Sequence, residues 1–494
     1  MFKTLANAWK IADLRQKLLF TILIIFLYRI GTAIPVPFVS ALAMETSGTT
    51  FEFLNTLSGG AFEQASLFAL GVSPYITASI VIQLLTVAIP ALERLAKQGE
   101  EGKKKITEIT RYITIAISIV TALGYYFLLK YNNALGSFVS VENKGWQKVL
   151  NWLLAIVIVA CYCAGSSIVM WLAERINDKG IGNGISVILF ANIVSRALPL
   201  FTKFVTMFKT EMGSTGIPST GLGQIQNPDG SIKPVPDVEI ATNAFPIGSI
   251  IFTVIVLVGL LAMMWFIIFI SDSERRIPVQ YAKRVVGRKM YGGQNSNIPL
   301  KLNMAGVMPV IFANAIITIP AMIAQFIPVT KVEDGVTYAR PVWYQIVRVF
   351  SSSHWFYCVL TFALILAFAY FYVAISFNPT EVAGNIQKNG GAIPGIRPGK
   401  ATSTFIQKVL SKITFIGALA LSVIAVIPLM VNVVLEWIRM SNGGEVNIAF
   451  WAFSYLGELA TIGTSIIIVV GVVLEIIREM EAQMTMRHYK GFLG

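Results

Sequence analysis

Long apolar runs separated by shorter polar segments dominate this chain. Most of the runs reach the roughly 20 residues that a helix needs to cross about 30 Å of hydrocarbon. They are continuous, whereas the strands of a membrane barrel would alternate apolar and polar residues over about ten positions. The pattern therefore predicts ten membrane-spanning helices, at Leu18–Ile34, Pro74–Leu92, Ile106–Leu129, Val149–Leu172, Gly184–Val205, Ile247–Ile270, Met304–Gln325, Trp355–Ser376, Ile413–Val434 and Phe453–Ile476.

The composition agrees with a membrane protein. Hydrophobic residues make up 55% of the 494 residues and charged residues 13%, whereas soluble domains carry about 25% charge. Because a chain of this length and mean hydropathy (+0.69) cannot cover its apolar surface in water, we expect an all-α membrane protein. The basic segment before Leu18 and the long apolar run after it predict a first span that is retained, not a cleaved signal peptide.

The basic residues predict the orientation. Because ten is an even number, both ends of the chain lie on the same side of the membrane. The segments on that side carry 27 Lys and Arg, including Arg111 near the start of the third span. The segments on the other side carry 10, including Lys203 near the end of the fifth span, and Arg29 and Arg196 lie within spans. The positive-inside rule then places both termini in the cytoplasm. The predicted parts are an N-terminal half at 1–205, an outer loop at 206–246, a C-terminal half at 247–476 and a cytoplasmic tail at 477–494.

Two polar loops between spans stand out from the rest. The segments Ser271–Leu302 and Phe377–Lys412 together hold 12 basic residues and are rich in Gly, Pro, Gln and Asn. Loops between apolar helices are exposed on one side of the membrane, and an exposed cationic surface attracts an anionic or acidic partner. The loops therefore predict a docking surface for something large. Simple membrane topology explains much of the net charge of +13 without a partner.

The segment before the second span is too polar to cross the membrane and too apolar to be a free loop. It runs from Phe53 to Gly71, contains Gly59 and Gly60, and ends just before Pro74. One interpretation is a re-entrant half-helix broken from the next span, which requires protein or a water-filled cavity around it. The other is an amphipathic helix that lies flat in the membrane interface. The residues favour neither.

Catalytic, metal and cofactor chemistry have little support. The two histidines, His354 and His488, lie far apart without a carboxylate or cysteine cluster around them. Cys161, Cys163 and Cys358 lie in apolar runs and are expected to be packing residues. The phosphate-binding pattern Gly-x-x-x-x-Gly-Lys-Ser/Thr does not occur. We therefore expect no enzyme, no metal and no cofactor, and we expect a partner to supply the energy for any transport.

Several long motifs, in order along nearly the whole chain, resemble the SecY/Sec61-alpha family of protein-conducting channels. They are Leu57-Ser-Gly-Gly-Ala, Ala69-Leu-Gly-Val-Ser-Pro-Tyr-Ile-Thr-Ala-Ser, Gly180-Ile-Gly-Asn-Gly-Ile-Ser, Tyr281-Ala-Lys-Arg, Pro299-Leu-Lys-Leu-Asn-Met-Ala-Gly, Phe377-Asn-Pro and Pro394-Gly-Ile-Arg-Pro-Gly. The outer loops Met207–Pro246 and Lys331–Val347 look longer than is usual for the family, and we assign them no role. The resemblance implies two pseudo-symmetric halves of five spans around an hourglass pore.

The resemblance further implies a ring of bulky apolar side chains at the waist of the pore. Such a ring makes no specific hydrogen bonds to a passing polypeptide, and a narrow apolar constriction loses its water and blocks ions. Carried over position by position, the ring falls on Val72, Ile76, Ile185, Leu189, Ile311 and Ile468. Ordinary packing in the core or against lipid is the alternative for each of them.

A plug and a lateral gate also follow from the resemblance. The segment before the second span becomes a re-entrant plug helix, with the residues Leu57, Ser58, Gly59, Gly60, Ala61, Phe62, Leu67, Phe68 and Leu70. The gate lies between the second and seventh spans, where apolar parts of the passenger leave into lipid. Its residues are Thr77, Ile80, Gln83, Asn314 and Thr318, with Ser79, Thr86 and Asn303 as further weak polar contacts.

The partners are also implied by the family. The two cytoplasmic loops meet the ribosome, whose RNA is polyanionic, and the motor ATPase SecA, through Lys283, Arg284, Arg288, Lys289, Arg397 and Lys400. Small SecE-like and SecG-like membrane subunits, unfolded polypeptide and membrane lipids complete the set. The expected location is the bacterial plasma membrane.

The expected function is to conduct unfolded secretory polypeptides across the membrane and to release membrane segments sideways into it. The first alternative is a polytopic secondary transporter of a small solute. Such transporters place ionisable groups at mid-membrane, and the predicted spans hold almost none. The second alternative is an intramembrane enzyme, for which no catalytic pair is visible within the spans.

Overall fold

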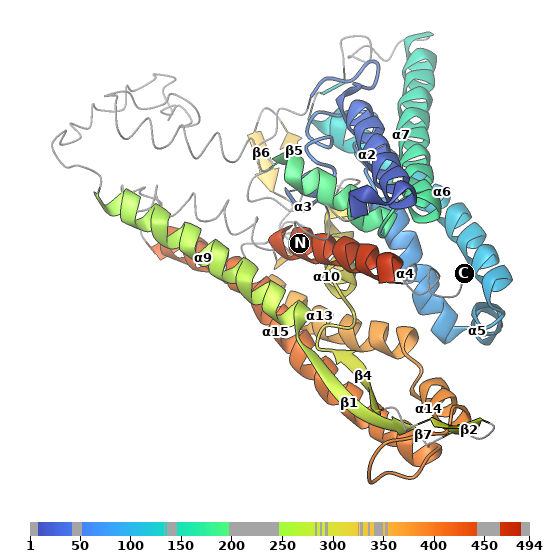
Figure 1. Ribbon diagram of the computed structural model, residues 1–494. Helices are drawn as coiled ribbons and strands as arrows, with labels where there is room; N and C mark the ends of the chain where they lie inside the picture. Colours follow the sequence, from blue (N-terminus) through green and yellow to red (C-terminus); the bar gives the residue numbers. More distant parts are fainter. Residues whose placement is uncertain are drawn as a thin grey trace.

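The computed structural model describes residues 8–41, 52–132, 134–135, 146–196, 247–281, 284–286, 289–291, 295–324, 326, 330–333, 336–339, 349–350, 354–441 and 465–485 (Figure 1). Helices dominate these ranges, as the apolar pattern predicts. The long helices are α2 (Ala12–Ala33), α6 (Glu100–Tyr131), α7 (Trp146–Lys179), α9 (Ile247–Asp272), α13 (Trp355–Ser376) and α15 (Lys400–Ser441). Two further helices lie at Gly184–Arg196 and 465–485.

The membrane-spanning character of the chain is confirmed. Within the described ranges, five helices are long and apolar enough to cross a membrane, or six if one bent pair is counted as a span. The eighth predicted span matches α13 at both ends, and the sixth starts with α9 at Ile247. The ninth is longer than predicted, since α15 begins at Lys400 inside the second polar loop.

Two predicted spans are broken, not continuous. The second consists of α4 (Ser73–Ala88) and α5 (Pro90–Ala96), which meet at an angle of 105°. The seventh consists of α10 (Met308–Ile317) and α11 (Ile319–Ala324), interrupted at Thr318. A proline follows each break, Pro90 and Pro320. Proline disfavours helical geometry in the residue before it, which explains the extended Ile89. Pro320 has no backbone N–H to donate to Ile316 O, which weakens the helix around Thr318.

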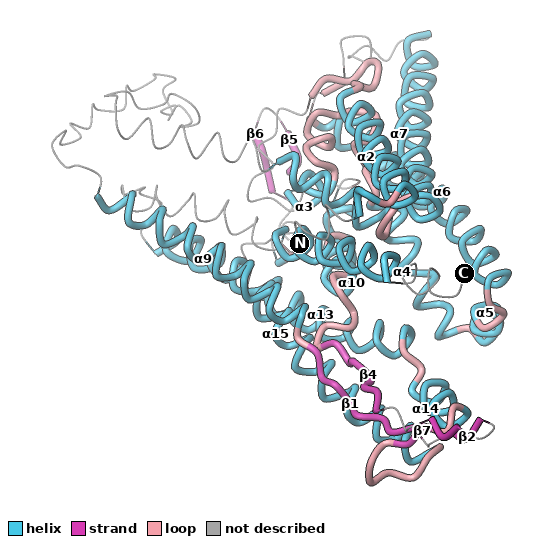
Figure 2. Tube along the Cα trace, viewed as in Figure 1, coloured by secondary structure: helices cyan, strands magenta, loops and turns pink. Residues whose placement is uncertain are grey.

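The polar loops contain strands that the sequence analysis did not predict. β1 (Glu274–Tyr281) pairs antiparallel with β4 (Asn295–Lys301) and with β7 (Gly391–Ala392), so the two loops share one small sheet. Figure 2 shows this sheet projecting from the helices beside α14 (Pro379–Lys388). The described residues also contain two short hairpins. β2 (Arg284–Val286) pairs with β3 (Lys289–Tyr291) between β1 and β4, and β5 (Thr330–Glu333) pairs with β6 (Val336–Ala339) after α11.

A single large apolar core joins the two halves of the chain. Its buried residues come from α2, α4, α7 and Gly184–Arg196 in the N-terminal half. They come from α9, α10, α13, α15 and residues 465–485 in the C-terminal half. A smaller cluster packs the sheet against α14 and the first turns of α15 through Ile277, Val279, Ile386, Ile393 and Ile406. The sheet is therefore held rigidly to the helices below it.

Candidate pore constriction and its surroundings

The six residues predicted for the ring lie together inside the protein. Val72, Ile76, Leu189, Ile311 and Ile468 are buried members of the large core, and Ile185 packs against it half-buried. They come from four separate helical elements, since Val72 caps the start of α4 and Ile76 follows one turn later. Each of the six therefore faces other parts of the chain, and none is an exposed lipid-facing residue.

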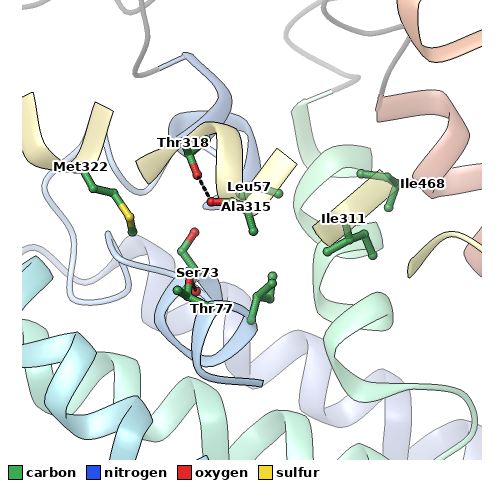
Figure 3. A pocket seen from close by; sticks show the side chains of 9 residues that line it. Leu57, Ser73, Thr77, Ile311, Ala315, Thr318, Met322 and Ile468 are labelled. Atoms are coloured by element: carbon green, nitrogen blue, oxygen red, sulfur yellow. Dashed lines mark hydrogen bonds between the residues drawn. The ribbon is translucent and has the colours of Figure 1, made fainter. Parts of the chain in front are cut away.

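A pocket opens where the predicted ring, plug and gate residues meet. Its lining includes Ile76, Ile311 and Ile468 from the ring, Leu57 from the plug segment, and Thr77 and Thr318 from the two gate helices. In Figure 3 these side chains surround a common space, with Ser73, Ala315 and Met322 beside them. Residues up to 411 positions apart, such as Leu57 and Ile468, thus share one wall.

The plug segment is folded differently from the half-helix that the sequence predicts. Its only helical turn in the described part is α3 (Glu52–Leu57), and residues 58–72 form consecutive turns. The local cause is backbone geometry, because Gly59 and Gly60 adopt φ of +68° and +90°, which a helix cannot contain. Gly71, at φ +55°, separates these turns from α4. The predicted hinge at Gly71–Pro74 therefore marks a real break in the chain.

The plug segment lies within the protein and not flat in the membrane interface. Leu57, Phe62, Phe68 and Leu70 are all buried, together with the polar Ser58. Non-helical backbone at membrane depth needs surrounding protein, and the segment has it on several sides. Burial decides between the two interpretations of the sequence in favour of a segment that re-enters the helical bundle.

Three side chains from the surrounding helices donate hydrogen bonds to backbone carbonyls of this segment. Asn192 Nδ2 donates to Leu57 O at 2.5 Å and also to the Tyr28 hydroxyl at 2.9 Å. The Tyr125 hydroxyl donates to Phe62 O, and the Tyr162 hydroxyl donates to Ala65 O at 3.1 Å. Asn192, Tyr125 and Tyr162 are each 0% exposed. Buried polar groups are costly unless they are paired, so these bonds specify where the segment sits.

Sequence reasoning missed these three residues, although a signal was present. A buried asparagine and two tyrosines in otherwise apolar spans need partners. These residues indicate that their helices face polar backbone groups. Which backbone they face is a matter of tertiary structure, since Asn192 and Leu57 are 135 positions apart.

The two predicted gate helices are in contact, and their hydroxyl groups bond within their own helices. Thr77 Oγ1 donates to Ser73 O at 3.0 Å, Thr86 Oγ1 to Gln83 O at 2.7 Å, and Thr318 Oγ1 to Ala315 O at 2.9 Å. Hydroxyls in helices commonly satisfy themselves in this way. Gln83 Nε2 likewise reaches Ser79 Oγ, on the same helix, at 3.3 Å. These four side chains therefore need no polar partner on the other gate helix.

The remaining gate residues are buried at the same contact. Ile80 on α4 and Asn314 on α10 are 3% and 5% exposed, and Asn303 lies just before α10 at 8%. Ile80 belongs to the large apolar core. The sequence prediction therefore selected residues that face the interior.

The docking residues are divided between two parts of the sheet region. Arg397 and Lys400 are exposed, in the loop after β7 and at the start of α15. The backbone of Arg284 lies in β2 and that of Lys289 in β3. Lys283 and Arg288 lie outside the described residues. Because β7 pairs with β1, the two predicted docking loops are neighbours in space.

The base of the sheet is tied to the last described helix. An Arg478 guanidinium nitrogen donates to Ser271 O and lies 3.3 Å from Asp272 Oδ1, at the end of α9. A cation at a helix C-terminus is favourable because the terminal carbonyls carry partial negative charge. Burial, followed by the positive charge of Arg478, lowers the pKa of Lys301 at the end of β4. Arg478 thus links the sheet to the helix that carries Ile468.

An ion pair connects two of the long helices. Arg111 of α6 forms an ion pair with Glu174 of α7 at 2.8 Å, which joins these helices. Within the described ranges, no group of three or more His, Cys, Asp or Glu side chains could hold a metal ion. The cysteines Cys161, Cys163 and Cys358 are free thiols.

The fold and the site together define a polytopic helical membrane protein of the channel type, with a buried apolar cluster at the junction of its halves. The SecY family profile matches residues 66–477. A protein translocase subunit SecY from Streptomyces galbus is 40% identical over 502 residues, covering 100% of both chains. The chain belongs to the SecY family.

Solved structures support the same fold. A structure described as a protein-conducting channel matches with a TM-score of 0.58 at 19% identity, covering 95% of this chain and 92% of that one. Sec61 in a canine ribosome–channel complex from the endoplasmic reticulum matches with a TM-score of 0.56 at 18% identity, with the same coverage. At these identities the likeness concerns the fold alone.

Proposed function

We propose that this chain is the protein-conducting subunit of a bacterial Sec translocase. It passes unfolded secretory polypeptides across the plasma membrane and releases apolar segments sideways into the lipid. One observation carries the proposal. The aliphatic side chains of four helical elements gather in one apolar cluster, and a folded, non-helical segment packs directly against them. A small-solute transporter is not favoured, because the full-length relative is named as a protein translocase subunit.

The six aliphatic residues serve as the seal of the pore. Their side chains offer a passing polypeptide no hydrogen bond and no charge, so chains of any sequence can slide through. The same chemistry excludes ions, since a narrow apolar constriction loses its water. Residues 57–70 serve as the plug, which occupies the resting channel beside Ile76 and Ile311 through Leu57.

The contact between α4 and α10 serves as the lateral gate. Its hydroxyls are satisfied within each helix, so separating the helices breaks few polar bonds. The breaks at Ile89 and Thr318 let each helix move as a short rod. An apolar passenger segment then exchanges contacts with α4 and α10 for contacts with lipid.

The sheet and the loop after it serve as the cytoplasmic docking surface. Arg397 and Lys400 are exposed there, and arginine suits bidentate contacts with phosphates and carboxylates. The partners are the ribosome, through its RNA, and a SecA-type motor. Small SecE-like and SecG-like subunits assemble with the chain in the membrane. Both termini then lie in the cytoplasm.

A reconstitution experiment tests the function. The chain is purified with the small subunits that accompany it and placed in liposomes with SecA, ATP and an unfolded secretory precursor. We expect the precursor to become protected from external protease in an ATP-dependent manner. A complex that carries a small solute but protects no precursor would support the transporter instead.

A further inference from the structure

Arg397 lies in a short loop that joins the small sheet to α15, and we call residues 393–399 the arginine loop. Figure 2 draws this loop between β7 and the start of α15. Its first residues are anchored in the apolar cluster below the sheet, because Ile393 is 4% exposed and Ile396 packs against the same cluster. Ile396 N also donates to Ile393 O at 3.0 Å. The chain is therefore fixed up to the residue before Arg397.

The residues after Arg397 lead directly into a helix. Pro398 restricts the backbone of the residue before it, so Arg397 favours an extended conformation. Gly399 adopts φ of +96°, which suits glycine, and turns the chain into α15. A backbone hydrogen bond from Ser403 N to Gly399 O, at 3.1 Å, begins the helix. Arg397 thus lies exposed between two anchored ends of the loop.

The hydroxyl group of Thr402 holds the backbone of Arg397 itself. Thr402 Oγ1 donates to Arg397 O at 2.9 Å, five residues earlier in the chain. Thr404, on the same helix, shows the ordinary arrangement, because its Oγ1 donates to Lys400 O, four residues earlier, at 3.0 Å. Thr402 thus reaches out of its helix to the loop, whereas Thr404 bonds within the helix.

The two threonines also differ in burial. Thr402 is 1% exposed, whereas Thr404 is exposed to solvent. A buried hydroxyl needs a hydrogen-bond partner, and here the partner is the carbonyl of an exposed arginine. An exposed hydroxyl can bond to water instead, so the bond from Thr404 is not required in the same way. The position of Arg397 is therefore tied to the interior of the protein.

Holding the loop in place affects how strongly a partner binds to it. A long, exposed side chain such as that of Arg397 loses conformational freedom on docking, and a mobile loop would lose more. Arginine also bonds to carboxylates and phosphates through a planar fork, whose direction has to match the partner. A backbone that is fixed beforehand lowers the first cost and sets the direction in which the fork leaves the loop.

We propose that Thr402 is a positioning residue of the docking surface, which holds the backbone of Arg397 so that its guanidinium meets an anionic oxygen of the SecA-type motor. This deepens the proposed function and rests on it, because it assumes that Arg397 docks the motor. Thr402 itself is buried and does not touch the motor. It acts through Arg397 alone.

A matched set of variants tests the role of the hydroxyl. The purified complex is placed in liposomes with ATP and an unfolded precursor, and the translocation rate is measured at increasing motor concentrations. We expect Thr402→Val, which removes the hydroxyl, to raise the motor concentration at half-maximal rate about two- to tenfold, the cost of ordering one more side chain or loop position. The maximal rate should not change, because the pore is intact.

Two further variants are the controls. Thr402→Ser keeps the hydroxyl and should behave as the parent chain. Thr404→Val removes a hydroxyl from the same helix, away from the arginine loop, and should also leave the motor dependence unchanged. Thr402→Ala, which also lacks the hydroxyl, gives a second measurement and should shift the motor dependence in the same direction as Thr402→Val. Equal shifts in Thr402→Val and Thr404→Val, or a lower maximal rate alone, would contradict the proposal.

A double-mutant cycle with Arg397→Ala separates positioning from a general effect on the fold. If Thr402 acts through Arg397, then Thr402→Val should cause no further shift in a complex that already carries Arg397→Ala. An equal shift in both backgrounds would show a purely structural role and overturn the proposal. If Arg397→Ala weakens the motor dependence but Thr402→Val does not, the proposal is wrong and the docking surface stands. If Arg397→Ala has no effect, the docking role is wrong, and the proposal fails with it.

Discussion

In the proposed function, six aliphatic side chains at the junction of the two halves form the seal of the pore. Ile76, Ile311 and Ile468 share the wall of one pocket with Leu57, and each is a residue type that neither donates nor accepts hydrogen bonds. The demand on them is physical. They must pack closely enough to expel water and yet give way to a chain of any composition. Branched aliphatic residues meet both conditions.

The double substitution Ile76→Asn and Ile468→Asn tests this role. An amide in the constriction holds water, so we expect resting ion conductance in planar bilayers to rise about tenfold or more. The control is Ile76→Leu with Ile468→Leu, which keeps volume and polarity and should leave the membrane sealed. Unchanged conductance in the asparagine variant, with the complex still assembled, would contradict the ring assignment.

At the scale of elements, the sheet built from two loops is the part of the proposed docking surface that is joined to the interior helices. It continues from α9 into β1 and leads from β4 into α10, so its base is joined to the helix that carries Ile311. Arg478 ties the same base to the helix that carries Ile468, ten residues away along that helix. A partner that shifts the sheet therefore acts on two ring residues through rigid helices.

The substitution Arg397→Glu tests the docking surface. Reversing an exposed charge that meets phosphates or carboxylates removes a charge-assisted bond and adds repulsion, so we expect export of a secretory precursor to slow about tenfold. The channel should still insert and assemble normally. Lys408→Glu, an equal change of charge at an exposed site on α15, is the control and should have a smaller effect. An unaltered export rate would show that Arg397 does not dock a partner.

At the scale of the whole molecule, the proposed function requires the two halves to meet at surfaces of different strength. The large core joins them around the ring. The contact between α4 and α10 has its hydroxyls bonded within each helix. A channel that opens sideways needs one contact that parts while the other holds. The distribution of polar bonds is consistent with α4 and α10 as that contact.

A cross-link between the halves tests the lateral gate. Thr77→Cys and Thr318→Cys place one thiol on each gate helix, and both positions line the pocket. With the native cysteines replaced, a short thiol cross-linker should block insertion of a membrane-protein segment, and a long, flexible one should restore it. The single variant Thr77→Cys with the same reagent is the control. Normal insertion in the presence of the short cross-link would place the exit elsewhere.

Individual elements show how far the sequence could predict the fold. The apolar run Trp355–Ser376 coincides with α13. In lipid, every backbone N–H and C=O must be hydrogen-bonded within the helix across the full thickness of the membrane, so the apolar run and the helix have the same length. The polar loop before α10 was more difficult. Ile277 and Val279 alternate with exposed residues in β1, a strand signal that we overlooked among the glycines and prolines. The re-entrant helix predicted for the plug segment is confined to α3, because Gly59 and Gly60 turn the chain after it.

The sequence by itself determined that this chain crosses a membrane many times and carries two cationic loops, and its motifs determined the family. These properties are local, since hydrophobicity, charge and helix length act on consecutive residues. Only the tertiary structure decided what the plug segment rests on. The bonds from Asn192, Tyr125 and Tyr162 to that segment join residues 63 to 135 positions apart. A polar side chain in a span indicates that a hydrogen-bond partner is needed, but the packing of the helices determines which group that partner is.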